Sequence, residues 1–281
     1  MVNFNGELLP DGNPLFTEAN RAFRYGDCLF ETIRTLGDKI NFWEDHYLRL
    51  MASMRILRME IPMDFTMEHL SDEIIKLLRA NDMLNQANRV RLSVFRREGG
   101  LYEPQTQEVS YVISAEKVPN PFFTLESKPY VVELFKEHYL NSGLLSTLKT
   151  NNRVLNVVGS VYASENEVDN YILLNHKKQV VEVLTGNIFL AVGTEIFTPP
   201  LEDGCINGII RKKIIEICNN ESEYSLQERS ISPFELQKAD ELFITNAITG
   251  VLSVTKYRRK EYQNELAKKL VAKLNALARL S

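Results

Sequence analysis

The chain has 281 residues, of which 44% are hydrophobic and 25% are charged. This is ordinary composition for a globular protein, and the length allows one large core or two smaller ones, which argues against a disordered chain or a fibre. The formal net charge of -4 gives no general attraction to nucleic acid or to an anionic membrane surface. We therefore expect neither a nucleic-acid partner nor a membrane partner.

The cysteines indicate the compartment. Cys28, Cys205 and Cys218 are an odd number without C-x-x-C spacing, which favours a reducing compartment over a disulfide framework or a zinc site. No metal site is expected. The first residues show no basic stretch followed by an apolar run, and no window approaches the 18 apolar residues of a membrane span. We expect a soluble, cytoplasmic protein.

Hydrophobic spacing in the first third of the chain predicts helices and strands together. Apolar residues recur at helical intervals over residues 42–58 and again over residues 67–80. Residues 89–95 alternate with period two, so Arg89 and Arg91 are expected on one face of a strand, and Val90, Leu92 and Val94 on the other. Residues 109–114 form a second β-rich run. The first third is therefore predicted to be α+β.

A proline-rich stretch then interrupts the pattern, and we place the domain boundary near residues 116–126. New strands are predicted at 130–135, 171–174, 180–184 and 188–192, with helices at 209–218 and from Leu266 to Leu277. The expected organisation is two α+β domains, residues 1–118 and 130–281, joined by a linker at 119–129.

Three features suggest chemistry, although each also has a plain structural explanation. Lys149 lies in the run LLSTLKTNNRVLN, where an amine with reduced hydration can act as a nucleophile, but most lysines are solvated. Gly208 precedes an amphipathic run in NGIIRKKII, which suits an anion site at a helix start or simply the start of a helix. Glu182 in VVEVLTGNIF is either a buried carboxylate that needs a partner or a solvent-facing residue of a strand.

Six motifs occur in one order along nearly the full chain: RYGDCLFETIR, DHYLRL, LKTNNR, EVLTGNIF, NGIIR and ADELFITNAITGV. Together they resemble the class IV aminotransferases, a family that contains branched-chain aminotransferases, D-amino-acid aminotransferases and aminodeoxychorismate lyases. The resemblance implies the two-domain α+β architecture of fold type IV enzymes, with pyridoxal 5'-phosphate as cofactor bound between the domains. It also implies a homodimer, which is the commonest symmetric assembly.

The resemblance assigns the cofactor-binding residues by motif. Lys149 would carry pyridoxal phosphate covalently and move a proton at the substrate. Glu182 would pair with the pyridine nitrogen and keep it protonated, so that the ring accepts electrons. The positions that match the family's phosphate and remaining cofactor contacts are Arg49, Asn187, Gly208, Ile209, Ile210 and Ala247. In branched-chain enzymes a tyrosine stands where this chain has Val154, and a phosphate-binding threonine stands where it has Ala247, so the site is not of the plain branched-chain type.

The substrate-binding residues are expected on two segments. The turn that holds Ile248 and Thr249 matches a loop whose backbone amides bind the substrate carboxylate. Near the expected substrate side stand Tyr25, Arg24, Arg91 and Arg96. Bidentate arginine is a natural partner of dicarboxylic or 2-oxo acids, although these arginines also suit a solvated strand face.

The reaction remains open between two chemistries. We place amino transfer between an amino acid, of branched-chain or D type, and a 2-oxo acid first. Thr32, which follows the YGDxxFE motif, favours instead a 4-amino-4-deoxychorismate lyase that releases pyruvate, with the threonine assisting proton delivery. The run GGLY lacks the arginine of the lyase pattern. A non-catalytic protein that merely binds pyridoxal phosphate is a third alternative, and the joint presence of Lys149, Glu182 and Arg49 argues against it.

Overall fold

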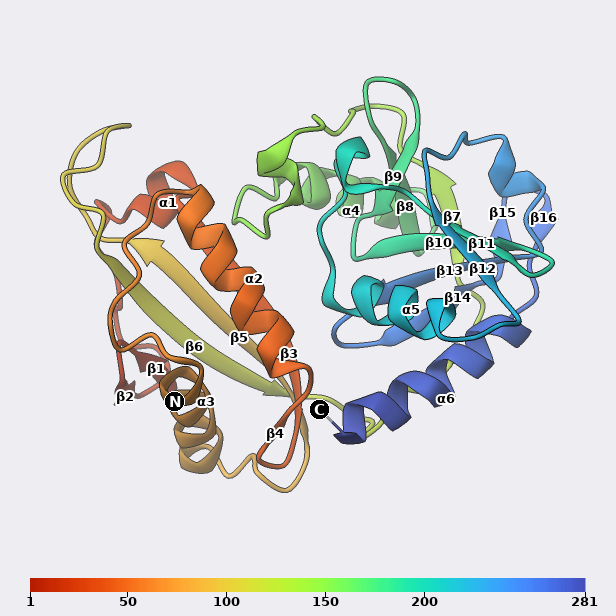
Figure 1. Cartoon of the computed structure of the whole chain (residues 1–281). Coiled ribbons are helices and arrows are strands. Elements are labelled where there is room, and N and C mark those ends of the chain that lie inside the picture. The colour runs from red at the N-terminus through yellow and green to blue at the C-terminus, as the bar shows by residue number, and fades with distance from the viewer. Residues whose placement is uncertain (281) are drawn as a thin grey trace. The chain divides into compact units, whose positions relative to one another are not determined.

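The computed structural model describes residues 1–280 and has mixed α and β structure, as predicted (Figure 1). Contacts within the chain define two compact units. The first contains Met1–Phe122 together with Lys149–Asn152, and the second contains Phe123–Leu148 together with Arg153–Leu280. The sequence assigned Lys149 to the second domain, whereas in the structure its short segment packs with the first unit.

The first unit is built on a six-stranded antiparallel sheet with strand order β2-β1-β6-β5-β3-β4. Its elements in chain order are β1 (Val2–Phe4), β2 (Glu7–Leu9), α1 (Arg21–Tyr25), β3 (Cys28–Leu36), β4 (Lys39–Ile40), α2 (Trp43–Ile56), α3 (Met67–Ala80), β5 (Ala87–Arg96) and β6 (Val109–Lys117). Helices α2 and α3 and strands β5 and β6 confirm the helices and strands predicted for this region.

The two faces of this sheet differ in character because successive side chains of a strand point in opposite directions. One row across the sheet contains Glu31, Leu92 and Ile113, which are register partners and are buried. Glu31 contacts α2. The alternate row contains Thr32 and Arg91, which are partners across β3 and β5 and are only half-buried. The predicted alternation of β5 is confirmed, and its opposite face carries polar and cationic groups.

The segment around Lys149 extends this sheet along the edge of β3. The N–H of Phe30 donates to the Lys149 carbonyl over 2.9 Å, and the N–H of Asn151 donates to the Cys28 carbonyl over 3.0 Å. Strand β4 pairs with β3 only at Thr35 and Leu36, so it does not cover this end of the edge. Backbone hydrogen bonds therefore fix the position of Lys149 independently of its side chain.

The second unit contains two five-stranded sheets, ordered β12-β11-β10-β13-β14 and β16-β15-β7-β8-β9. Its elements are β7 (Val131–Leu134), a 3-10 turn η1 (Leu144–Thr147), α4 (Val154–Glu165), β8 (Asn170–Leu174), β9 (Val180–Val183), β10 (Asn187–Val192), β11 (Glu195–Thr198), η2 (Leu201–Asp203), α5 (Ile209–Asn219), β12 (Ser225–Glu228), η3 (Glu235–Gln237), β13 (Glu241–Asn246), β14 (Gly250–Val254), β15 (Lys256–Tyr257), β16 (Lys260–Glu261) and α6 (Glu265–Leu280). Strands β7 to β10 and helices α5 and α6 confirm predictions, whereas α4, β13 and β14 were not predicted.

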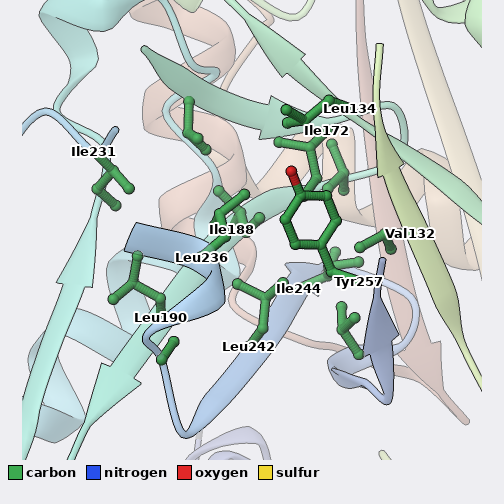
Figure 2. Packing of buried hydrophobic residues seen from close by; sticks show 14 of the residues in the cluster. Val132, Leu134, Ile172, Ile188, Leu190, Ile231, Leu236, Leu242, Ile244 and Tyr257 are labelled. Atoms are coloured by element: carbon green, nitrogen blue, oxygen red, sulfur yellow. The ribbon is translucent and has the colours of Figure 1, made fainter. Parts of the chain in front are cut away.

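A continuous apolar core joins the two sheets of this unit. Figure 2 shows Ile188 and Leu190 of β10 and Ile244 of β13 packed among residues of the other sheet, such as Ile172 and Tyr257. All are essentially inaccessible to solvent, and burial of such side chains is the main favourable term in folding. This core supports the ends of β9, β10 and β13, where the candidate site residues of the unit lie.

The other face of β10 and β13 packs against helix α5. Phe189 and Phe243 stack there with ring centroids 5.0 Å apart, and α5 contacts β13. Asn187 and Thr245, which are register partners, lie on the same face two residues further along these strands.

Within residues 1–280, no helix combines the length and apolar character that are needed to cross a membrane.

Candidate active site

Lys149 and Arg91 direct their charged groups to one aromatic ring. The Nζ atom of Lys149 lies 4.5 Å from the centroid of the Phe30 ring, and Cζ of Arg91 lies 3.7 Å from the same centroid. The Lys149 residue is half-buried, and Phe30 is buried. An aromatic face attracts cations through its quadrupole. Two positive groups therefore lie within 4.5 Å of the centroid of one ring.

Hydrogen bonds fix the orientation of Arg91. Its Nη2 atom donates to Oδ1 of Asn151 over 2.9 Å, and its Nε atom donates to Oγ of Ser93 over 3.2 Å. Thr32 is its register partner on β3. Sheet geometry thus brings the predicted substrate arginine, the predicted catalytic threonine and the predicted cofactor lysine to one face of the first unit.

Arg49 belongs to a buried ionic cluster with Glu31 and His46. Its Nε atom donates to Oε1 of Glu31 over 2.8 Å, and its second terminal nitrogen pairs with Oε2. Nδ1 of His46 lies 2.6 Å from the same Oε2. Burial opposes ionisation of Glu31, but Arg49 and His46 outweigh it and lower the pKa to about 2. Glu31 is therefore a carboxylate at neutral pH.

The remaining predicted substrate residues of this unit have separate environments. The ring centroids of Tyr25 and Tyr102 lie 5.5 Å apart, and Cζ of Arg21 lies 5.0 Å from the centroid of the Tyr25 ring. Arg24 is exposed, and its Nε atom donates to the Glu18 carbonyl over 2.7 Å.

Arg96 has a structural role that the sequence did not indicate. Its guanidinium is buried and donates to Asp27 over 2.9 Å, to the carbonyls of Leu57 and Arg58 over 2.8 and 3.1 Å, and to the side chain of Gln107. These acceptors occupy its fork of donors. The arginine thereby ties the end of α2 to the loop before β3, and, contrary to the prediction, its donors are occupied by the chain itself and not directed to a substrate.

In the second unit, the backbone of one residue, Ile206, connects Glu182 and Asn187. The N–H of Ile206 donates to Oε2 of Glu182 over 2.9 Å, and the carbonyl of Ile206 accepts from Nδ2 of Asn187 over 2.8 Å. Both side chains are buried. The structure therefore selects the buried alternative for Glu182, and the carboxylate and the amide together fix the residues that precede α5.

Gly208 is the N-cap of helix α5, and no side chain caps this end. A Cβ atom built on Gly208 would lie only 2.0 Å from Oδ1 of Asn187, so the close packing requires glycine. Ile209 and Ile210 form the first turn, whose N–H groups have no acceptor within the helix. Such a terminus favours an anion through its N–H groups and its dipole.

The turn after β13 is organised by Asn246. Its Oδ1 atom accepts from the N–H of Ile248 over 3.0 Å and from the N–H of Thr249 over 2.9 Å. These are the two amides that the sequence predicted for a substrate carboxylate, so a side-chain oxygen of this chain already lies where an anionic oxygen was expected. Ala247, which lies between Asn246 and Ile248, is half-buried and offers no hydroxyl.

Sequence reasoning did not assign roles to Phe30, Glu31, His46, Asn151 or Asn246. All five lie in the motifs quoted above: Phe30 and Glu31 in RYGDCLFETIR, His46 in DHYLRL, Asn151 in LKTNNR and Asn246 in ADELFITNAITGV. His46 also precedes Arg49 by three residues on a predicted helix. Residues three apart on a helix share a face. The contact of that face with Glu31 required the tertiary structure.

The family model for amino-transferase class IV matches residues 28–257, and the chain belongs to this family. It is 25% identical to aminodeoxychorismate lyase of Vibrio harveyi over 84% of this chain and 85% of that protein. It is also 25% identical to a putative branched-chain-amino-acid aminotransferase of Methanocaldococcus jannaschii, over 97% of this chain and 93% of the relative.

Similarity to solved structures supports the same fold. The branched-chain aminotransferase of Thermoproteus uzoniensis, solved with norvaline, superposes with a TM-score of 0.87 at 23% identity, covering 99% of this chain and 94% of that one. The predicted fold type IV architecture is thereby confirmed. These relatives include both a transaminase and a lyase.

Proposed function

We propose that this protein is a pyridoxal 5'-phosphate-dependent aminotransferase that moves an amino group between an amino acid, of branched-chain or D type, and a 2-oxo acid. The observation that carries the proposal is the placement of Lys149. Its backbone is bound to the edge of β3, and its amine lies against Phe30 beside the guanidinium of Arg91. A half-buried amine in fixed geometry suits covalent attachment of an aldehyde cofactor.

The chemistry of the remaining residues suits that cofactor. Arg49 and the N–H groups of Ile209 and Ile210, which begin just after Gly208, would bind the phosphate. The carboxylate of Glu182 would accept a hydrogen bond from the protonated ring nitrogen. Its hydrogen bond to the N–H of Ile206, whose carbonyl accepts from Asn187, would hold it in place. When bound, pyridoxal phosphate supplies an electron sink for the substrate α-carbon.

The chain's own groups then account for substrate handling. The amine of Lys149 would take the proton from the α-carbon and return it. Ile248 and Thr249 would offer their amides to the α-carboxylate once Asn246 yields them, and Arg91 would bind the second carboxylate of a dicarboxylic amino donor or 2-oxo acid. Tyr25, Arg24 and the half-buried Ala247 would border the site as minor contacts. Amino acids and 2-oxo acids are therefore the proposed small-molecule partners.

A specific observation favours the alternative, a 4-amino-4-deoxychorismate lyase that releases pyruvate and forms 4-aminobenzoate. Thr32 lies directly opposite Arg91 in the β3–β5 register and is half-buried on the face that carries Phe30. A hydroxyl in that position suits proton delivery to a departing group. A non-catalytic protein that only binds pyridoxal phosphate is the third candidate.

Two assays on the protein loaded with pyridoxal phosphate separate these functions. Single half-reactions with a panel of D- and L-amino acids should bleach the visible absorbance of the lysine-bound cofactor if amino transfer occurs. Pyruvate release from aminodeoxychorismate, without any 2-oxo acid, would instead establish the lyase.

The visible band should be absent from Lys149→Ala and present in Lys177→Ala, an exposed lysine of the second unit. A band that survives in Lys149→Ala contradicts the proposed attachment.

We also propose a homodimer. Helix α4 exposes Val154, Val157 and Val161, which share one side of the helix, and Leu144 and Leu145 of the preceding turn are exposed as well. Clustered apolar surface of this kind usually marks an interface. Light scattering should give twice the chain mass, and Val157→Asp should lower it. A monomeric parent protein at micromolar concentration contradicts this proposal.

A further inference from the structure

The carboxylate of Glu31 is the most deeply buried charge of the first unit that the proposed chemistry does not use. It lies on β3 with 2% of its side chain exposed, and it faces helix α2. Two side chains of α2, one helical turn apart, converge on it: Arg49 through Nε and a terminal nitrogen, and His46 through Nδ1. A buried charge pair gains little stability over apolar packing, so its geometry needs another explanation.

The charges of this cluster are defined. Ionisation of Glu31 is favoured by its two partners. Burial lowers the pKa of His46, and the charges of Arg49 and Lys149 act in the same direction against the hydrogen bond to Glu31. At neutral pH, His46 is therefore neutral and donates its Nδ1 proton to the carboxylate. Glu31 and Arg49 cancel each other in charge.

The contacts fix the plane of the Arg49 guanidinium. A carboxylate that binds Nε and a terminal nitrogen together aligns with the planar fork of the arginine and prevents its rotation. His46 holds the carboxylate from another side, at 2.6 Å. The side chain of Arg49 is 11% exposed, against 2% for Glu31 and 1% for His46. Arg49 is thus the member of the cluster that a ligand can reach.

We infer that Glu31 is a positioning residue that orients Arg49 toward the phosphate of the cofactor, and that His46 holds Glu31 in place. This rests on the proposed function in one respect, the assignment of the phosphate to Arg49. Because Glu31 neutralises Arg49, it contributes direction and not positive potential. If Glu31 acts by orienting Arg49, its removal should weaken binding of the phosphate. If it acts only through its charge, its removal should strengthen that binding.

The variant Glu31→Gln distinguishes orientation from charge. It makes the cluster one unit more positive, and it also breaks the contact in which two carboxylate oxygens bind Nε and a terminal nitrogen of Arg49. The quantity to measure is the dissociation constant of the apo chain for pyridoxal phosphate and for pyridoxal, which lacks the phosphate, by fluorescence titration. We expect the preference for pyridoxal phosphate to fall by about tenfold in Glu31→Gln, as for loss of a charge-assisted hydrogen bond. Glu31→Asp, with its shorter reach, should also lose preference. An unchanged or increased preference in Glu31→Gln overturns the inference.

Glu73→Gln is the matched control. Glu73 is a buried carboxylate of α3 in the same unit, held by Asn3 and Lys76, so its loss tests general damage to the fold. The phosphate preference should not change in this variant. Where Glu31→Gln fails to fold by circular dichroism, Glu31→Asp and His46→Gln provide the same comparison, and retained preference in both overturns the inference.

Arg49→Gln distinguishes failure of the inference from failure of the proposed function. If Arg49→Gln leaves the phosphate preference intact, the assignment of the phosphate to Arg49 is wrong. If Arg49→Gln lowers the preference and the Glu31 variants do not, only the positioning role is wrong. In the Arg49→Gln background, Glu31→Gln should have no further effect on the preference, because its action passes through Arg49.

Discussion

Arg91 and Asn151 are joined by a hydrogen bond of 2.9 Å between Nη2 and Oδ1. Asn151 follows Lys149 by two residues, and its own N–H donates to the Cys28 carbonyl on the edge of β3. The segment that carries the proposed cofactor lysine therefore also sets the guanidinium that would select the substrate. We therefore propose that cofactor chemistry and substrate specificity are coupled through the three residues from Lys149 to Asn151.

Asn151→Ala tests this coupling. Loss of the acceptor should leave Arg91 less well oriented, and KM for substrates with a second carboxylate should rise by about tenfold, while KM for monocarboxylic substrates stays near its original value. Steady-state kinetics with a dicarboxylic and a monocarboxylic amino donor provide the measurement. Asn152→Ala is the control, because Asn152 donates to the Gly26 carbonyl instead. Equal increases for both donors would show that Asn151 does not act through Arg91.

Glu182→Gln separates the charge of this residue from its structural contact. A glutamine oxygen can still accept the N–H of Ile206, so the approach to α5 should remain intact. The negative charge proposed for the ring nitrogen is lost, and we expect turnover to fall by about 100-fold or more, with a much smaller change in cofactor affinity. Rapid-mixing kinetics of the loaded protein and equilibrium titration measure the two effects. Full activity in Glu182→Gln would exclude the role, and the exposed Glu195→Gln is the control.

The proposed cofactor residues and the residues that hold them in place differ in how far the sequence reveals them. Lys149, Arg49 and Glu182 could be proposed as cofactor residues from the resemblance of their motifs to the family, although none of them stands out by its local sequence alone. The partners Glu31 and Asn151 could not, because their roles arise where β3 meets α2 and where a distant segment joins the edge of a strand. These are long-range contacts, which local spacing does not encode.

Arg96 illustrates the opposite error. Its place directly after the alternating run at 89–95 suggested a cation near the substrate, but the alternation has ended there, since Phe95 and Arg96 are both buried. Its actual partners are Asp27 and two carbonyls at the end of α2. A strand pattern predicts which face a residue occupies only while the alternation holds.

The ionic cluster predicts how stability depends on pH. The pKa of Glu31 is about 2 in the folded chain against a usual 4.5, so its stabilising contribution is complete above pH 4.5 and is lost as the pH falls toward 2. The full contribution is on the order of 3 kcal/mol. His46, whose pKa is lowered from 6.5, destabilises the fold further as the pH falls below 6.5, since the unfolded chain takes up the proton more readily.

Urea denaturation of the parent chain and of Glu31→Gln, from pH 7 downward, checks this dependence. The difference in unfolding free energy between the two should be largest at neutral pH and should shrink below pH 4.5, because only the parent chain contains the titrating carboxylate. A difference that is constant with pH contradicts the assignment of this titration to Glu31.

The close approach of Gly208 and Asn187 yields a prediction about both stability and cofactor binding. The methyl group of Gly208→Ala would lie 2.0 Å from Oδ1 of Asn187, so either the asparagine or the start of α5 must shift. We expect a loss of about 1–3 kcal/mol of stability from this overpacking, together with weaker binding of pyridoxal phosphate at the displaced helix terminus. Gly143→Ala, where no atom lies within 4 Å of the added methyl group, should be nearly neutral.

Asn187→Ala removes the clashing oxygen but also the hydrogen bond to Ile206, so the double variant should be less destabilised than the sum of the single variants. Additive losses would show that the strain of Gly208→Ala arises elsewhere.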